Sequence, residues 1–197
     1  MKRYQYRSYR EYVEAQKRGF EKKRNRVWAN RENVEAISRV IGPCETGICH
    51  GVRGGQEVGW FREFTGGQVI GTEIGESEAP HTVRWDFNER HPPWVGEFDF
   101  VYSNAFDHSF DPARTLAVWW EQLRPGGRLI IETDERNEHT GKVSKGVNAT
   151  DPTGLTLGEL VALVEEVTKE APEIVELPFV TYRYRNAILA RKGGLDG

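Results

Sequence analysis

The sequence His-Gly-Val-Arg-Gly-Gly-Gln-Glu at residues 50–57 decides the fold. It follows a short apolar run and precedes a segment with the pattern of a helix, so it predicts a tight strand-to-helix turn. Glycine allows the backbone of such a turn to approach a ligand closely, and the helix behind it offers free N–H groups. Because many tight turns contain glycine, the function of this stretch depends on the strands around it.

Short apolar runs alternate with helical or turn segments from Cys44 onward. This alternation predicts an α/β fold with a parallel sheet and right-handed crossovers. The expected strands are residues 47–52, 68–74, 82–87, 98–103, 128–132, 174–180 and 182–190. The expected helices are residues 58–64, 112–122 and 155–171. Residues 133–154 form a long polar stretch, which is typical of a functional or disordered loop.

A basic segment precedes this pattern. Residues 1–42 hold 12 Lys and Arg against 5 Glu, a balance of +7, whereas the remainder holds 15 against 25, a balance of −10. Ser8 and Glu11 fit a capping box for a helix to about Lys23, and Asn30 begins a second helix that Gly42 ends. We expect a basic helical extension (1–42), a main domain (43–192) and a loose tail (193–197). The basic segment either binds a polyanion such as nucleic acid or is a solvated helix docked on the acidic body.

The composition favours a soluble, cytoplasmic protein with no membrane partner. Charged residues make up 29% of the chain, and no apolar run approaches the roughly 20 residues of a membrane span. The N-terminus leads into charged residues, which argues against a secretion signal. Cys44 and Cys49 are the only cysteines and are too few for a zinc site, so we expect two reduced thiols.

Polar, glycine and aromatic residues stand at the ends of the first four expected strands. In an open parallel sheet, ligands bind at the carboxyl ends of the strands, near the point where strand order reverses. The residues at these ends are Gly51, Arg53, Gly55, Glu73, Ile74, Asp86, Phe87, Ser103, Asn104, Asp107 and His108. Singly, Glu73 could be a solvated strand end, Asp86 a cap and His108 a packing residue. Their order at consecutive strand ends favours a pocket for a nucleoside cofactor.

Six segments of the chain stand in a recognisable order. They are Gly-Val-Arg-Gly-Gly at 51–55, Val-Ile-Gly-Thr-Glu-Ile at 69–74, Trp-Asp-Phe at 85–87, Phe-Asp-Phe-Val-Tyr-Ser at 98–103, Phe-Asp-His-Ser-Phe-Asp-Pro at 106–112 and Leu-Arg-Pro-Gly-Gly at 123–127. Together they resemble the class I S-adenosylmethionine-dependent methyltransferases, especially the small-molecule group. The resemblance implies S-adenosylmethionine (SAM) as cofactor. It also implies a Rossmann-like, doubly wound sheet of seven strands, mostly parallel with an antiparallel last strand.

The resemblance also implies roles for individual residues at the cofactor. Gly51 and Gly55 would line the methionine and ribose end of SAM. Glu73 would hold the ribose hydroxyls, at the spacing of about 20 residues from the glycines that is usual for such a carboxylate. Asp86 would meet the adenine amino group, with Phe87 beside the ring.

Further residues complete the expected cofactor site. Ile74 follows Glu73, and Ser103 and Asn104 would lie near the methionine. Two positions depart from the family pattern: His50 stands where an acidic residue is usual, and Arg53 stands where a glycine is usual. Arg53 could pair with the methionine carboxylate of the cofactor.

Methyl transfer requires an in-line position for the acceptor and exclusion of water, because the sulfonium of SAM already activates the methyl group. For a hydroxyl acceptor, His108, Asp107 or His139 could take the proton. His108 also fits a structural role at the floor of the site, and the sequence favours that role over the base. We predict no metal site, because the acidic residues near His139 on the long polar stretch have no fixed ligand spacing and favour a solvated lid. These residues are Asp134, Glu135 and Glu138.

Three functions are compatible with these patterns. The first is a methyltransferase of a small molecule, such as a sugar or glycan precursor. The second is a methyltransferase of RNA or protein that holds its acceptor with residues 1–42. The third is a non-catalytic interaction protein with the cofactor-binding fold, in which residues 1–42 are the interaction module. A nicotinamide-dependent dehydrogenase is disfavoured, because the last two of the six segments do not belong to its pattern.

Overall fold

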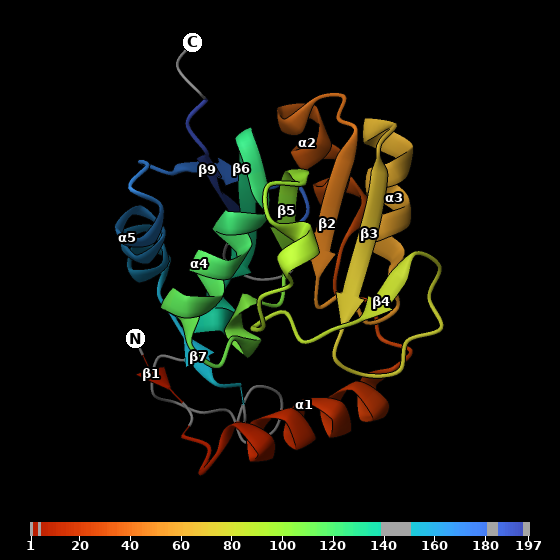
Figure 1. The fold of residues 1–197 in the computed structure, drawn as a ribbon, viewed down its shortest axis with the longest axis vertical. Helices are drawn as coiled ribbons and strands as arrows, with labels where there is room; N and C mark the ends of the chain where they lie inside the picture. The colour runs from red at the N-terminus through yellow and green to blue at the C-terminus, as the bar shows by residue number, and fades with distance from the viewer. Residues whose placement is uncertain (1, 4, 139–150, 181–184, 195–197) are drawn as a thin grey trace.

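The computed structural model describes residues 2–3, 5–138, 151–180 and 185–194. Its centre is a seven-stranded sheet with the order β4-β3-β2-β5-β6-β9-β8 (Figure 1). The strands are β2 (Thr46–His50), β3 (Gln68–Glu73), β4 (Thr82–Arg84), β5 (Phe98–Ser103), β6 (Leu123–Asp134), β8 (Glu173–Glu176) and β9 (Arg185–Arg191). The first five run parallel, and β9 lies antiparallel to both of its neighbours. The predicted doubly wound sheet with an antiparallel last strand is confirmed.

Helices α2 (Arg31–Ile41) and α3 (Gln56–Thr65) cover one face of the sheet. The Asn30 side chain caps α2 by accepting hydrogen bonds from two backbone N–H groups in the first turn, and α2 ends at Gly42, as predicted. Val34 of α2 and Phe61 of α3 belong to one buried cluster with apolar side chains of the strands. The second helix of the basic segment is thus packed into the core, while the division of the chain at residue 42 stays a prediction.

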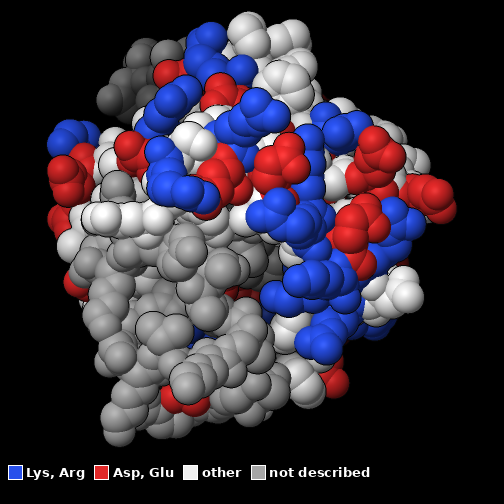
Figure 2. Space-filling view, turned by 90° about the horizontal axis from the view of Figure 1, so that it is seen from below, with Lys and Arg blue, Asp and Glu red and all other residues white. Residues whose placement is uncertain are grey.

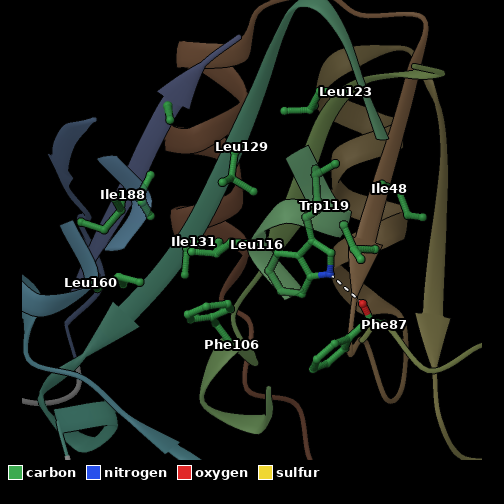
Figure 3. Close-up of a cluster of buried hydrophobic side chains, with 14 of the residues drawn as sticks. Ile48, Phe87, Phe106, Leu116, Trp119, Leu123, Leu129, Ile131, Leu160 and Ile188 are labelled. Atoms are coloured by element: carbon green, nitrogen blue, oxygen red, sulfur yellow. Dashed lines mark hydrogen bonds between the residues drawn. The ribbon is translucent and has the colours of Figure 1, made fainter. Parts of the chain in front are cut away.

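Helices α4 (Pro112–Gln122) and α5 (Leu157–Thr168) cover the other face, around the fully buried Trp119 (Figure 3). The indole Nε1 of Trp119 donates a hydrogen bond to the backbone oxygen of Phe87 at 3.0 Å. The indole also stacks on the His50 ring, with centroids 4.9 Å apart. A buried indole that satisfies its N–H in this way combines a large apolar contact with a fixed orientation. The core therefore holds in place the turn that contains Asp86 and Phe87.

Helix α1 (Tyr9–Lys23) lies across the carboxyl ends of the parallel strands, at the bottom of Figure 1. Ser8 is its N-cap, with a side chain that accepts a hydrogen bond from the Glu11 N–H, and Gly19 does not interrupt the helix. Tyr12 and Phe20 are its buried residues, and the Phe20 ring lies so close to Gly75 that a Cβ there would be 2.3 Å from it. The start of the basic segment is thus a helix docked on the main domain, and its binding of a polyanion stays a prediction.

Several element boundaries differ from the prediction. Strand β4 ends at Arg84, because it is an edge strand that pairs with β3 over three residues only, so Asp86 and Phe87 lie in the turn beyond it. Strand β6 already begins at Leu123, and its pairing with β5 changes register in the segment predicted as a turn, where Gly126 has φ 82°. Strand β8 ends at Glu176, before the predicted residue 180.

The described residues of the predicted loop at 133–154 contain regular secondary structure. They include the 3-10 helix η3 (Glu135–Glu138) and β7 (Thr153–Gly154), which pairs with β1 (Lys2–Arg3). Two-residue strands have no sequence period, so this small sheet could not be predicted. Residues 139–150, with the predicted His139, lie outside the described part.

Both cysteines are free thiols, and burial raises their pKa values. None of the helices described here combines the length and apolar character needed to cross a bilayer.

Candidate functional site

The turn from β2 to α3 has the open backbone that its sequence predicts. Gly51, Arg53 and Gly55 have φ values of 73°, 45° and 71°, in the left-handed region that favours glycine. A Cβ on Gly51 would lie 2.8 Å from the Ala105 methyl carbon and 3.3 Å from the Phe87 ring. Residue 51 must therefore be glycine for three segments to pack together: the turn after β2, the turn after β4 and the segment after β5.

Glu73, at the end of β3, faces this turn. Its Oε2 accepts a hydrogen bond from the Arg53 N–H at 2.8 Å, and its Oε1 accepts from the N–H groups of Ile74 and Gly75 at 2.9 and 3.3 Å. The side chain is 7% exposed. The carboxylate is thus held rigidly at the carboxyl edge, and it can still accept bonds because two oxygens offer about four lone-pair positions.

Asp86 and Phe87 follow β4 at the same edge. The Asp86 Oδ2 accepts a hydrogen bond from the Tyr9 hydroxyl of α1 at 2.8 Å, and its Oδ1 accepts from the Asn88 N–H and side-chain amide at 3.0 and 2.7 Å. The hydrogen bond between Tyr9 and Asp86 ties α1 to the turn that follows β4. Burial and the neighbouring Asp86 carboxylate raise the pKa of the Tyr9 hydroxyl, so Tyr9 stays a hydrogen-bond donor.

Two adjoining cavities open at this edge of the sheet. The first, which we call the α1 cavity, lies under Tyr12, Gln16 and Phe20 and is lined by Glu73, Ile74, Asp86 and Phe87. The second, which we call the β6 cavity, is lined by Trp28, Asn104, Asp107, Glu132, Thr133, Asp134, Arg136, Asn137, Asp151 and Arg185. Lys23, Gly51, Arg53, Ala105 and His108 line both. The cavities lie where strand order reverses, between β2 and β5, which is the usual ligand position in such sheets.

Comparison with known proteins supports the fold. No family model matches the chain, and no curated protein matches it by sequence. Among solved structures, 1,6-didemethyltoxoflavin-N1-methyltransferase of Burkholderia thailandensis has a TM-score of 0.74 at 18% identity, covering 96% of this chain and 92% of that chain. A SAM-dependent methyltransferase of Aquifex aeolicus has a TM-score of 0.63 at 15% identity, with coverages of 88% and 97%. Phosphoethanolamine N-methyltransferase 2 of Haemonchus contortus has a TM-score of 0.65 at 13% identity, with coverages of 94% and 60%.

The chain has the class I methyltransferase fold. The fold expected from the sequence resemblance is therefore confirmed. The strand ends of this methyltransferase fold bring together most of the predicted site residues: Gly51, Arg53, Glu73, Ile74, Asp86, Phe87, Asn104, Asp107 and His108 all line one or both cavities.

His50 and Ser103 lie beneath the site rather than in its lining. The His50 ring is fully buried, with Nδ1 at 2.8 Å from the Thr72 hydroxyl and Nε2 at 2.8 Å from the Gln122 side-chain oxygen. Burial lowers the pKa of His50 to about 4, against the opposing effect of the Gln122 hydrogen bond. The buried Ser103 hydroxyl donates to the His50 carbonyl at 2.9 Å and accepts from the Ala105 N–H at 3.0 Å. Both residues support the turn, and Gly55 serves as the N-cap of α3.

Arg53 lies where the two cavities of the methyltransferase fold meet. Desolvation lowers the pKa of its guanidinium, an effect that Glu73, Glu57 and Asp107 oppose. Its buried Nε and Nη1 atoms have no hydrogen-bond partner among the described residues. A buried donor without a partner is costly, so an anionic group entering the junction would stabilise Arg53.

His108 and Asp107 lie on the 3-10 helix η2 (Phe106–His108), directly beyond β5. The ring nitrogen Nδ1 of His108 is 3.4 Å from Oδ1 of Asp151, which follows the long polar stretch. One donor atom from each of Asp107, His108 and Asp151 lies within 4.8 Å of the others, and this is the one group in the described chain with the spacing to hold a cation.

Sequence reasoning missed the charged floor of the β6 cavity. Arg185 of β9 pairs with Glu132 of β6, whose other oxygen accepts a hydrogen bond from the Tyr102 hydroxyl, and Arg136 pairs with Asp134. Glu132 directly follows the apolar run Leu129–Ile131, and Arg185 stands shortly before the apolar run Ala187–Ala190. A charged residue beside a buried apolar run is the signal that could have identified them. Asp151 had no local signal, because it lies at the end of a long polar stretch.

Proposed function

We propose that this protein is a methyltransferase that transfers the methyl group of SAM to a small molecule. The observation that carries the proposal is that Glu73 and Asp86 share one cavity with the glycine turn at the switch point of the sheet. The fold agrees with this reading. The similar Burkholderia and Haemonchus methyltransferases were both solved with S-adenosylhomocysteine (SAH).

In this proposal the α1 cavity holds the nucleoside half of SAM. Glu73 would accept the ribose hydroxyls, Asp86 the adenine amino group, and Ile74 and Phe87 would contact the adenine ring. Asp86 Oδ2 already accepts from Tyr9, but a carboxylate oxygen can accept a second bond. When bound, SAM supplies an activated methyl group.

The methionine half would extend to the junction of the cavities. Gly51 lines this junction, Arg53 would bind the methionine carboxylate with its unpartnered nitrogens, and Asn104 would contact the same half. The β6 cavity would then hold the acceptor. Its lining is strongly polar, and α1 closes one side, so we infer a small polar acceptor. We propose His108 as the residue that accepts the proton, with Asp107 as the alternative. A role for His139 stays a prediction.

SAH is expected to raise the melting temperature of the purified protein, and Glu73→Ala is expected to abolish the shift. A ligand at 100 times its dissociation constant stabilises a protein by about 2.7 kcal/mol, which at this chain length is a shift of about 5–10 °C. Glu73→Ala removes the proposed ribose contact. It also removes the acceptor for three backbone N–H groups, so the melting temperature without ligand must be measured for each variant.

The matched control is Glu76→Ala. Glu76 is an exposed glutamate three residues beyond Glu73, paired with Arg84 on the surface, and should keep the full SAH shift. Absence of a shift in the unsubstituted protein at saturating SAH would instead favour a non-catalytic protein with this fold.

A nucleic-acid acceptor is the second candidate, because basic side chains gather over α1 (Figure 2). Arg10, Arg18 and Lys22 of α1 are exposed. The RNA reading predicts that binding of a single-stranded RNA weakens steeply with salt and falls tenfold or more in the Arg18→Glu/Lys22→Glu variant. Deleting residues 1–26 would not test this cleanly, because the deletion would also remove one wall of the α1 cavity.

The control for RNA binding is the charge reversal of two exposed residues elsewhere, Lys169→Glu/Arg191→Glu. An equal loss in both variants would indicate unspecific attraction. No binding at low salt would leave the small-molecule reading.

A further inference from the structure

The backbone that carries His108 is fixed from two directions. The Tyr12 hydroxyl of α1 donates a hydrogen bond to the His108 carbonyl at 2.9 Å. The Thr153 hydroxyl of β7 donates to the carbonyl of the next residue, Ser109, also at 2.9 Å. Helix η2 is therefore held between α1, through Tyr12, and β7, through Thr153, which follows Tyr12 by 141 residues. A side chain on such a support is well placed for a role that needs fixed geometry.

The side chain of His108 has one buried nitrogen that points to a specific partner. Nδ1 is buried and has no aligned hydrogen bond within the described residues, yet it lies 3.4 Å from Oδ1 of Asp151. The Asp151 side chain is 6% exposed. Contacts between a base and the residue that orients it are often long or poorly aligned without ligand and shorten in the complex.

The neighbouring buried carboxylates are already paired with cations. Asp134 pairs with Arg136, and Glu132 pairs with Arg185. In the part of the chain that the structure describes, the one ion-pair partner of Asp151 is His108. An almost fully buried carboxylate next to an imidazole holds the proton of that ring on the facing nitrogen and stabilises the ring when it becomes charged.

We propose that Asp151 is the positioning residue that keeps the His108 proton on Nδ1, so that Nε2 accepts the proton of the methyl acceptor. This inference rests on the proposed methyl transfer. As the acceptor oxygen or nitrogen forms its bond to the methyl carbon, the carbon–sulfur bond breaks and its electron pair stays on sulfur. The acceptor proton moves to Nε2, which leaves imidazolium beside the Asp151 carboxylate. The acceptor class is therefore a protic nucleophile, with a hydroxyl as the simplest case.

The test is the tautomer of His108, read from the ring nitrogen shifts of the ¹⁵N-labelled full-length protein by NMR at a pH at which the ring is neutral. The signals are assigned by their loss in His108→Gln. We expect a protonated Nδ1 and an unprotonated Nε2. Asp151→Asn should lose this signature, because an amide can offer its own N–H to Nδ1, whereas Asp151→Glu should retain it.

Asp107→Asn is the matched control, since Asp107 belongs to the same group of donors. It should leave the tautomer unchanged. A tautomer that changes in Asp107→Asn but not in Asp151→Asn overturns the proposal. A ring signal that shifts when MgCl₂ is added overturns it as well, because the three residues would then form a cation site.

The two proposals fail separately. Asp151→Asn should keep the melting-temperature shift with SAH, which shows that the variant is folded and that its α1 cavity is intact. A missing SAH shift in the unsubstituted protein would refute the methyltransferase function while leaving the tautomer result as measured. An Nε2-protonated His108 in a protein that does bind SAH would refute the role of Asp151 alone.

Discussion

Replacing Arg185 with methionine is expected to lower the free energy of unfolding by about 3–5 kcal/mol. The Arg185 side chain is 7% exposed, and its ion-pair partner Glu132 is 1% exposed. Methionine fills much of the same space but leaves the Glu132 carboxylate buried without its cation. The Tyr102 hydroxyl and the Asn33 amide still donate to Glu132, but neither carries a charge. An uncompensated buried charge is among the most destabilising results of a single substitution.

Urea unfolding at pH 7 with linear extrapolation measures this effect. The control is Arg191→Met, at the exposed end of the same strand, which should change stability by about 0.5 kcal/mol or less. The double variant Glu132→Gln/Arg185→Met should recover part of the lost free energy of unfolding, because it removes the unpaired Glu132 charge as well as Arg185. Equal effects of Arg185→Met and Arg191→Met would contradict a stabilising role for the buried pair.

Replacing Glu57 with glutamine is expected to remove a large dependence of stability on pH. Glu57 lies in the first turn of α3 and is 4% exposed. Burial raises the pKa of its carboxyl from 4.5 to about 8; the backbone hydrogen bond and Arg53 oppose this, and Glu132 and Glu73 add to it. The folded protein thus holds this proton more tightly than the unfolded chain. The stabilisation is fully present below about pH 4.5 and is lost as pH rises through about 8.

A pKa difference of this size corresponds to a stability change on the order of 4–5 kcal/mol across that range. The measurement is the free energy of unfolding between pH 5 and 9 for the protein and for Glu57→Gln. As pH rises, the free energy of unfolding of Glu57→Gln should increase relative to that of the unsubstituted protein. Glu63→Gln, an exposed glutamate of the same helix, should give a flat difference. Parallel pH curves for the protein and Glu57→Gln would show that the buried carboxyl does not titrate in this window.

The strands and helices of the methyltransferase fold could be predicted because each carries its own local pattern. The strand β5 and the helix α4 begin and end at the predicted residues, since a turn follows the strand and Asp111 and Pro112 mark the start of the helix. The order of Glu73 and Asp86 at consecutive strand ends was enough to place both in one cavity. Such residues are predictable because the topology brings every strand end to the same edge.

Contacts between distant segments could not be predicted. The Tyr9–Asp86 hydrogen bond depends on how α1 docks, and the Asp151–His108 pair depends on the path of the chain after a long polar stretch. His50 is the reverse case, because it stands beside the glycine turn in the sequence while its ring is buried against Trp119. Successive side chains of a strand point to opposite faces of the sheet. A shift of one position is therefore enough to place a side chain in the core instead of the cavity.

The place of β9 within the sheet has a consequence for the synthesis of the protein. Residues 185–191 lie between β6 and β8, so they occupy an interior position although they are synthesised after both of these strands. A nascent chain that stops before them leaves the edge of β6 open and Glu132 without Arg185. Unpaired strand edges attract other chains. The sheet can therefore close only after these residues have left the ribosome, and until then the edge of β6 stays open.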